Sequence, residues 1–428
     1  MLPPKRRDNL KEKIEGITNK FGVSAYTRIL NYEIFQTIKS YLLKLYNGDK
    51  VVPPPSELPF KVEDVFSFIP PGILTFPTIV GIDPLENYAS FENALLAIVR
   101  YNDKRYFLSL PIIPDRFGNL YSVFVVGEDP EELYSIELTN LLTKLAIRNS
   151  GYYGKFLRLS LAGENIERVK FKVLPSPTIT LDDIYLKDKS DLEDFIEAVK
   201  RKNHGLRYLF VGEPGTGKTD TVKAIIAERL KSESESDGIT VIEVDAGYKI
   251  PLNIIFEYAE IFSPVLLCID DIDLLVGTRD KLFNPKELSS ALQALDGFVK
   301  RDDHYLIATT NDRHLVDIAL RRPGRFDLII EFKELDPDFY PSLVLRESKD
   351  ERLSEIFKEE KIRKKLANLK VTGAFLVTLV KHLLKQRYNE TKYDPHTVLA
   401  LIDKLHKSFK FEVKQEEKLG FVGGFEHE

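Results

Sequence analysis

The stretch "GEPGTGKT" at residues 212–219 constrains the fold of this chain more than any other part of the sequence. It fits the pattern G-x-x-x-x-G-K-[ST], follows the apolar run "RYLFV" and precedes the helical pattern "KTDTVKAIIAERL". In such a strand–loop–helix unit, backbone N–H groups close around phosphates and the helix N-terminus adds favourable partial charge. The motif predicts a nucleotide-phosphate loop in an α/β fold. The residues that we assign to this loop are Gly212, Pro214, Gly215, Thr216, Gly217, Lys218 and Thr219.

A second motif follows about 50 residues later, where the apolar run "VLLCI" ends in Asp270 and Asp271. In nucleotide hydrolases with a loop of this kind, an acid at the end of a neighbouring strand organises Mg²⁺, and a polar residue orients the attacking water. Thr219 and Asp270 are therefore candidate magnesium ligands, with ATP as the nucleotide and Asp271 as the base. The alternative is that these aspartates only cap a strand exit.

Two further polar features lie downstream. The run "HYLIATTND" ends a third predicted strand in Asn311, which could orient water or contact the γ-phosphate, although an ordinary turn residue would look the same. The loop "ALRRPGRFD" places Arg322 and Arg325 three residues apart. Arginines there could neutralise transition-state charge on a nucleotide held by a neighbouring subunit, or simply form a solvated basic loop.

The chain changes character at "LPSPTIT", residues 174–180. Beyond it, nearly all-apolar runs alternate with helical stretches, which is typical of a parallel sheet covered by helices on both faces. From Leu335 onward the period is helical, which predicts a small all-helical domain, called the lid below. The predicted boundaries are 1–175 for a mixed α/β N-terminal domain, 176–334 for the P-loop subdomain, 335–412 for the lid and 413–428 for a Gly-rich tail.

Within residues 1–175 the sequence predicts helices over 11–48, a hairpin turning at Asn102 and Asp103, and a strand at 120–126. A helix is expected from an N-cap at Asp129 to about Arg148. The runs "KFLRLSL" and "RVKFKVL" are predicted strands. No motif in this region carries recognisable chemistry.

Composition excludes several classes of protein. Over 428 residues the net charge is only −5, so no global basic field favours nucleic acid. There is no apolar run long enough to span a membrane, no signal peptide pattern and no HExxH zinc motif. The single cysteine, Cys268, lies in an apolar run and is expected to be a buried, inert thiol. A soluble, cytoplasmic protein is the expectation.

The ordered set of loop, "CIDDID", "ATTN" and "ALRRPGRFD", followed by a helical lid, resembles the core clade of the AAA family of ATPases over roughly residues 178–410. The resemblance implies a ring, usually a hexamer, with ATP and Mg²⁺ between protomers and Arg322 and Arg325 as arginine fingers. Asn311 matches the polar sensor. The resemblance also implies adenine contacts, at Asp183, Ile184 and Tyr185 in the linker and at Gly373 and Ala374 in the lid.

Three departures from the family pattern bear on function. Asp271 stands where glutamate is usual, which shortens the base by one methylene, so we expect hydrolysis to be slow or to use a relay water. The segment 247–264 is about ten residues shorter than in AAA unfoldases, with Tyr248 as a candidate substitute for the pore aromatic. This shortening and "SSALQALDGF" resemble the Bcs1-like branch of the family. Phe375 replaces an acid that is frequent in the lid.

These observations favour an ATP-dependent ring ATPase that hydrolyses ATP at subunit interfaces and remodels or translocates a protein partner, held through residues 1–175. Two alternatives remain. One is an ATP-gated oligomeric scaffold with little hydrolysis, which Asp271 favours. The other is a nucleic-acid-associated ATPase, which the net acidity and the lack of a basic, aromatic-interleaved stripe disfavour.

Overall fold

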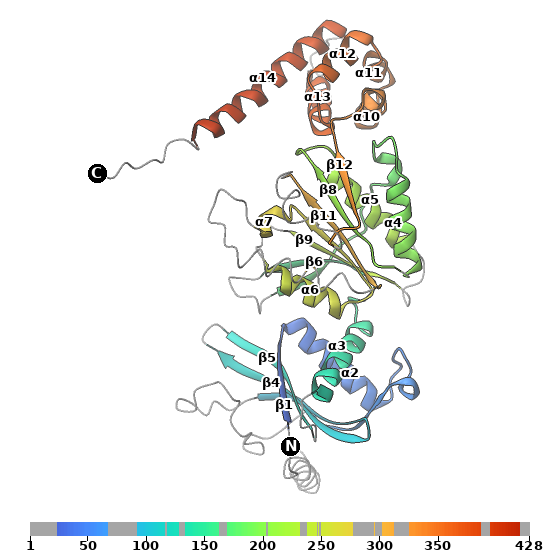
Figure 1. Cartoon of the computed structure of the whole chain (residues 1–428), viewed down its shortest axis with the longest axis vertical. Coiled ribbons are helices and arrows are strands. Elements are labelled where there is room, and N and C mark those ends of the chain that lie inside the picture. Colours follow the sequence, from blue (N-terminus) through green and yellow to red (C-terminus); the bar gives the residue numbers. More distant parts are fainter. Residues whose placement is uncertain are drawn as a thin grey trace, which may run out of the picture. The chain divides into compact units, whose positions relative to one another are not determined.

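The computed structural model describes residues 24–66, 92–115, 118–127, 133–161, 169–202, 204–231, 238–245, 247, 250–276, 295, 302–311, 325–386 and 394–419, and everything below concerns these residues (Figure 1). Two compact units emerge. The first comprises Met1–Ser176, Ala198–Arg207 and Leu230–Ile307. The second comprises Pro177–Glu197, Tyr208–Arg229 and Ala308–Glu428.

The N-terminal part of the first unit contains a five-stranded antiparallel sheet with the order β1-β5-β4-β3-β2. Its turn between β3 and β4 uses Asn102 and Asp103, whose φ angles of 49° and 58° fall in the left-handed region that Asn and Asp tolerate. The predicted hairpin is therefore confirmed. The strands are β1 (Ser24–Leu30), β2 (Phe60–Phe66), β3 (Glu92–Tyr101), β4 (Lys104–Asp115) and β5 (Gly118–Gly127).

Two helices belong to this part, α2 (Tyr32–Asn47) and α3 (Leu133–Arg148). The side chain of Asn31 caps α2 by accepting a hydrogen bond from the Ile34 backbone N–H, and Gly48 ends it in a left-handed conformation. Helices were expected over 11–48, but Ser24–Leu30 is a strand, because Tyr26, Thr27 and Ile29 suit a pleated strand that pairs with β5. The predicted Asp129 cap lies outside the described residues.

A seven-stranded sheet has the order β12-β8-β11-β10-β9-β6-β7. The pairs β8–β12, β9–β10 and β6–β9 are parallel, as the apolar runs predicted, whereas β6–β7 is antiparallel. The apolar runs predicted after the linker, "LRYLFV", "ITVIEV", "VLLCID", "HYLIATT" and "DLIIEF", all form strands. They are β8 (Arg207–Gly212), β9 (Thr240–Asp245), β10 (Val265–Asp270), β11 (His304–Thr310) and β12 (Leu328–Phe332).

The strands β6 (Phe156–Leu161) and β7 (Val169–Val173) precede the expected boundary at 175, yet they join this second sheet. Arg158 on β6 donates two hydrogen bonds to Glu243 on β9, at 2.8 and 2.7 Å. Strand patterning reveals the two strands but not which sheet they extend, because any exposed strand edge offers the same backbone groups.

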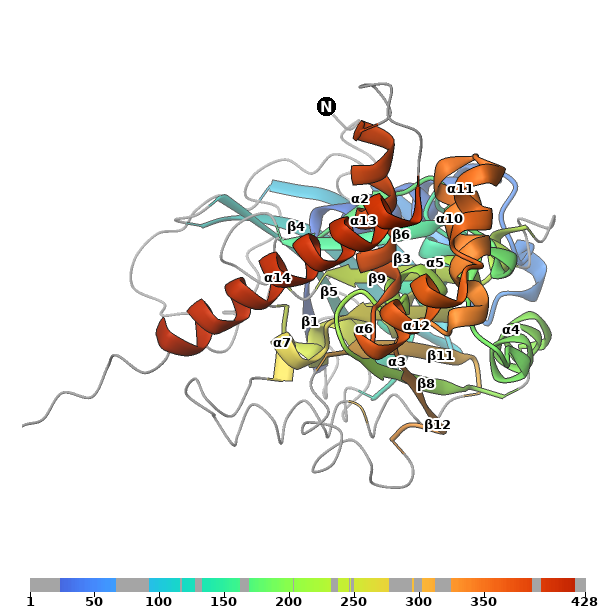
Figure 2. The ribbon, with the colours of Figure 1, turned by 90° about the horizontal axis from the view of Figure 1, so that it is seen from above.

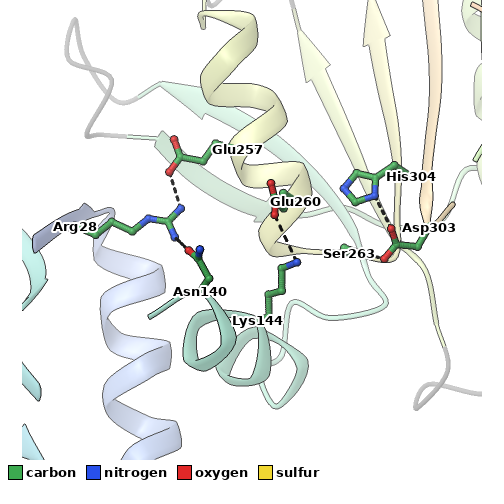
Figure 3. A network of polar contacts seen from close by, with 8 residues as sticks. All are labelled: Arg28, Asn140, Lys144, Glu257, Glu260, Ser263, Asp303 and His304. Atoms are coloured by element: carbon green, nitrogen blue, oxygen red, sulfur yellow. Dashed lines mark hydrogen bonds and ion pairs between the residues drawn. The ribbon is translucent and has the colours of Figure 1, made fainter. Parts of the chain in front are cut away.

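Four helices accompany the seven-stranded sheet: α4 (Ser190–Arg201), α5 (Lys218–Leu230), α6 (Leu252–Ile261) and α7 (Asp273–Val276). Within the first unit, α6 contacts the N-terminal part through Arg28, which lies 2.5 Å from Glu257, and Lys144, which lies 3.7 Å from Glu260 (Figure 3). The ring of Phe171 on β7 meets Tyr258 edge-on at 5.3 Å. The N-terminal part thus contacts α6 through polar side chains, whereas the aromatic contact joins α6 to the edge of its own sheet.

The lid consists of helices with a common apolar core that includes Phe357, Leu376 and Ile402. Figures 1 and 2 show α14 continuing past the other lid helices. It runs to Leu419, into the expected tail, because "KQEEKL" contains good helix formers. The lid helices are α10 (Tyr340–Ser348), α11 (Glu351–Ile356), α12 (Glu360–Asn368), α13 (Gly373–Gln386) and α14 (Pro395–Leu419).

Candidate functional site

The phosphate loop has the expected setting, between β8 and α5 in the second unit. Lys218 is the first residue of α5 and is only 6% exposed. Its Nζ donates hydrogen bonds to the carbonyls of Gly212 (2.7 Å) and Glu213 (3.0 Å) and to Asn311 Oδ1 (2.7 Å). The fold therefore brings two predicted site residues, Lys218 and Asn311, into direct contact.

Asn311 reaches the lysine because of its place in the sheet. It follows β11 directly, at the carboxyl end of a strand whose residues are all buried. Ligands of open α/β sheets bind at the carboxyl ends of the strands. An amide oxygen accepts from the ammonium group without neutralising its charge, whereas a carboxylate in the same place would neutralise it.

The loop needs glycine at two positions for different reasons. Gly215 has a φ of +79°, and a Cβ there would lie 2.6 Å from the Cβ of Ala374. Gly212 lies so close to β12 that a Cβ would come within 2.2 Å of the Phe332 carbonyl oxygen. The two glycines thus permit the turn of the loop and its close contact with neighbouring backbone.

Gly373 and Ala374, the lid residues expected near the nucleotide, lie against this loop. The backbone N–H of Ala374 donates to the Gly215 carbonyl at 3.1 Å. Gly373 precedes it at the start of α13, and its hypothetical Cβ would lie 3.6 Å from that same carbonyl. The start of α13 therefore packs against the phosphate loop.

The linker residues Asp183, Ile184 and Tyr185 contact another part of the lid. Arg346 of α10 donates to the Asp183 carbonyl at 2.8 Å, and its guanidinium lies 5.2 Å from the centre of the Tyr185 ring. Hydrogen bonds from the Thr180 backbone and hydroxyl groups lower the pKa of Asp183. Sequence reasoning did not identify Arg346, because no local pattern links it to a linker 163 positions away.

The two carboxylates after β10 belong to the first unit. Asp270 ends the strand and is the register partner of Asp245 on β9. Asp271 follows with a φ of +52°, and its carbonyl accepts from the Leu274 N–H at 2.9 Å. Left-handed backbone is uncommon outside glycine and is tolerated best by Asn and Asp. Asp271 therefore suits the turn in which it stands.

Of the two predicted arginine fingers, the structure describes only Arg325. Arg322 lies outside the described residues, as does Tyr248. Arg325 is described and is only 7% exposed within its own chain. A side chain that reaches a neighbouring subunit would be expected to extend from the surface, so the burial of Arg325 also fits a role inside its own chain.

Two other expectations concern β9, β10 and the segment between them. Cys268 is buried on β10, as expected, and burial raises the pKa of its thiol well above the usual value. The connection from β9 to α6 spans only residues 246–251 and includes Ile250, which is 1% exposed. It overlaps the first part of the segment 247–264 that the sequence predicts to be shortened, and α6 occupies the middle of that segment.

Residues 208–334 match the family described as "ATPase family associated with various cellular activities (AAA)". These residues form an AAA domain. Such a domain is a P-loop NTPase fold, which agrees with the mostly parallel seven-stranded sheet and the helical region that follows. ATP hydrolysis is the general activity of the AAA family.

Several curated proteins are similar to the chain. A proteasome-activating nucleotidase of Methanococcus vannielii is 35% identical over 138 residues, which cover 30% of this chain and 34% of that protein. The ATP-dependent zinc metalloprotease FtsH of Buchnera aphidicola is 28% identical over 285 residues, 59% of this chain and 46% of that protein.

A third relative is the probable inactive ATP-dependent zinc metalloprotease FTSHI 5 of Arabidopsis thaliana. It is 28% identical over 241 residues, 52% of this chain and 18% of that protein. The chain therefore matches less than half the length of each of these three relatives. None of the helices in the described residues has both the length and the apolar character needed to cross a membrane.

Proposed function

We propose that the AAA domain binds and hydrolyses ATP with Mg²⁺ in a homo-oligomeric ring, usually a hexamer in this family, and uses the energy to remodel or translocate a protein partner. The observation that carries the proposal is the contact between Lys218 and Asn311 inside a glycine loop that the lid also contacts. In this arrangement the lysine that would hold the phosphates is already oriented by the residue that would sense them.

The residues present fit the magnesium ion. A threonine hydroxyl at position 219 and a carboxylate at 270 are the hard oxygen ligands that Mg²⁺ accepts alongside nucleotide phosphates. When bound, the ion neutralises charge on the phosphates. Lys218 supplies a further positive charge, and Asp271 would take the proton of the attacking water. We further propose that Asp183, Ile184, Tyr185, Gly373 and Ala374 enclose the adenine.

The N-terminal part is proposed as the site that receives the protein partner. It has its own five-stranded sheet and is packed onto α6. The short connection at 246–251 favours a partner that is engaged through this part rather than gripped by a long pore loop. The names of the relatives, a proteasome-activating nucleotidase and ATP-dependent proteases, support a protein as the partner.

Steady-state ATP hydrolysis across a wide range of protein concentrations tests the enzymatic part. Turnover per subunit should rise with concentration as subunits assemble, and it should be lost in Asp271→Asn. Lys218→Ala should lose nucleotide binding itself. Tight binding of Mg·ATP without turnover at any concentration would instead support the ATP-gated scaffold, which the shorter acid at 271 favours.

A further inference from the structure

A row of positively charged side chains crosses three neighbouring strands of the N-terminal sheet. Lys61 on β2 is the register partner of Arg100 on β3, and Arg100 is the register partner of Arg105 on β4. Directly opposed residues in antiparallel strands have Cβ atoms about 4.5–5.5 Å apart, and like charges placed there are destabilising. Without a compensating carboxylate, the row would therefore destabilise the sheet.

All three side chains are accessible. The side chain of Arg100 is 44% exposed and that of Arg105 is 51% exposed, and Lys61 is also exposed. The next residue, Tyr101, points the other way, because its hydroxyl donates to Glu137 of α3 at 3.3 Å. Successive residues of a strand alternate between faces, so the row lies on the sheet face away from α3.

One carboxylate is shared by the two arginines. Glu63 accepts from Arg100 Nε through Oε1 and from Arg105 Nε through Oε2, both at 2.7 Å. The register of β2 shifts between Val62 and Asp64, so Glu63 is the extra residue of a β-bulge, a device that re-aims a side chain. Three cations against one carboxylate leave the row with a net positive charge.

Partial burial raises the pKa of Glu63, but the hydrogen bonds from Arg100 and Arg105 lower it below its ordinary value overall. The glutamate is therefore ionised at neutral pH. Its carboxylate binds the two guanidinium groups in the same way that a glutamate or aspartate side chain of another protein would.

We propose that Lys61, Arg100 and Arg105 form a docking row for an acidic polypeptide segment, with Glu63 acting as an internal competitor for the two arginines. The inference rests on the proposed function, in which the N-terminal part receives a protein partner. An extended acidic segment suits the row, because alternate side chains of a strand face the same way. Binding of single-stranded nucleic acid usually uses aromatic rings on which bases stack. The rings of Tyr101 and Tyr134 lie on the other face of the sheet, so they offer no such stacking at the row.

The test uses the full chain and a fluorescently labelled, glutamate-rich 12-residue peptide, with anisotropy recorded without nucleotide. The wild type should bind the peptide with an affinity that falls as salt rises. Arg105→Glu should weaken binding at least tenfold. Glu63→Gln should tighten it several-fold, because it removes the competing carboxylate. Lys50→Glu makes the same change of charge at an exposed position outside the row and should leave binding unchanged.

The increase in peptide affinity expected for Glu63→Gln separates docking from a purely structural ion cluster. Loss of a structural carboxylate would only lower the stability of the fold. Equal binding by the wild type and Arg105→Glu, or no gain in Glu63→Gln, would overturn the proposal. Preference for a single-stranded oligonucleotide of equal charge would overturn it too. ATP turnover of the wild type is measured separately, so failure of the proposed ATPase would be seen independently of the peptide.

Discussion

Lys218 and Asn311 lie 93 positions apart in sequence and form a 2.7 Å hydrogen bond in the second unit. The contact joins the start of α5 to the end of β11. A change at Asn311 therefore acts on the lysine as well as on any phosphate that the lysine holds.

Asn311 can be tested by two substitutions of different charge. Asn311→Ala removes one acceptor of Lys218 and should lower turnover about 100- to 1,000-fold with a smaller effect on ATP affinity, by analogy with losing one polar catalytic group. Asn311→Asp should weaken ATP binding more, because a carboxylate would neutralise the lysine and repel the phosphates. Isothermal titration with ATP separates the two effects. Equal affinities in both variants would contradict this role.

Gly215 is expected to be intolerant of a side chain. Gly215→Ala would place a Cβ 2.6 Å from that of Ala374 and would force a left-handed φ on alanine. The strain should lower the free energy of unfolding by about 1–3 kcal/mol and weaken the contact between α13 and the loop. Thermal unfolding and ATP affinity provide the readout. Gly151→Ala is the matched control, since a Cβ there meets nothing within 4 Å.

Asp271 combines a proposed catalytic role with a left-handed backbone. Asp271→Asn keeps a residue that tolerates φ of +52°, so turnover should be lost while the unfolding temperature stays the same. Asp271→Glu restores the side-chain length that is usual in the family. Glutamate tolerates a left-handed backbone less well than aspartate does. We expect it to unfold at a lower temperature than the wild type. A large drop in stability for Asp271→Asn would point to a structural carboxylate instead.

Arg325 can be assigned to its own chain or to a neighbour by mixing subunits. Arg325→Ala and Asp271→Asn should each be inactive alone under the proposed mechanism. If Arg325 acts in trans, mixed rings contain interfaces that combine an intact Asp271 with an intact Arg325, so some turnover returns. No recovery on mixing, together with a lower unfolding temperature for Arg325→Ala, would fit its burial and assign it a structural role.

Asp303 gives the first unit a pH dependence. Its carboxylate accepts hydrogen bonds from His304 (2.7 Å) and from the Ser263 hydroxyl, and these contacts hold its pKa far below the usual range (Figure 3). A carboxyl whose pKa falls on folding stabilises the protein above its unfolded pKa of about 4, and this contribution is lost as pH falls.

The comparison of the wild type with Asp303→Asn checks this sign. The wild type should be the more stable at pH 7 in urea unfolding, and the difference should narrow as pH falls below about 4. A difference that widens on acidification would show that Asp303 does not contribute as an ionised acceptor.

Local patterns predicted the phosphate loop, the five strands after the linker and the helical lid, because each depends on residues close together in sequence. The strand at Ser24–Leu30 was missed, because its pairing with β5 decides its conformation and β5 lies almost 100 residues later. The left-handed φ of Asp271, the bulge at Glu63 and the contact of Arg346 with the linker depend on tertiary packing. No spacing rule reveals these features.

The hairpin of β6 and β7 has a practical consequence for dissecting this protein. The motif-based boundary near residue 175 invites a truncated chain that begins at the linker, but such a chain would lack the strand that pairs with β9 along residues 156–159. It would expose the backbone edge of β9 and leave Glu243 without Arg158. A fragment that begins before Phe156 keeps that edge covered and is the sounder starting point for biochemical work on the ATPase half.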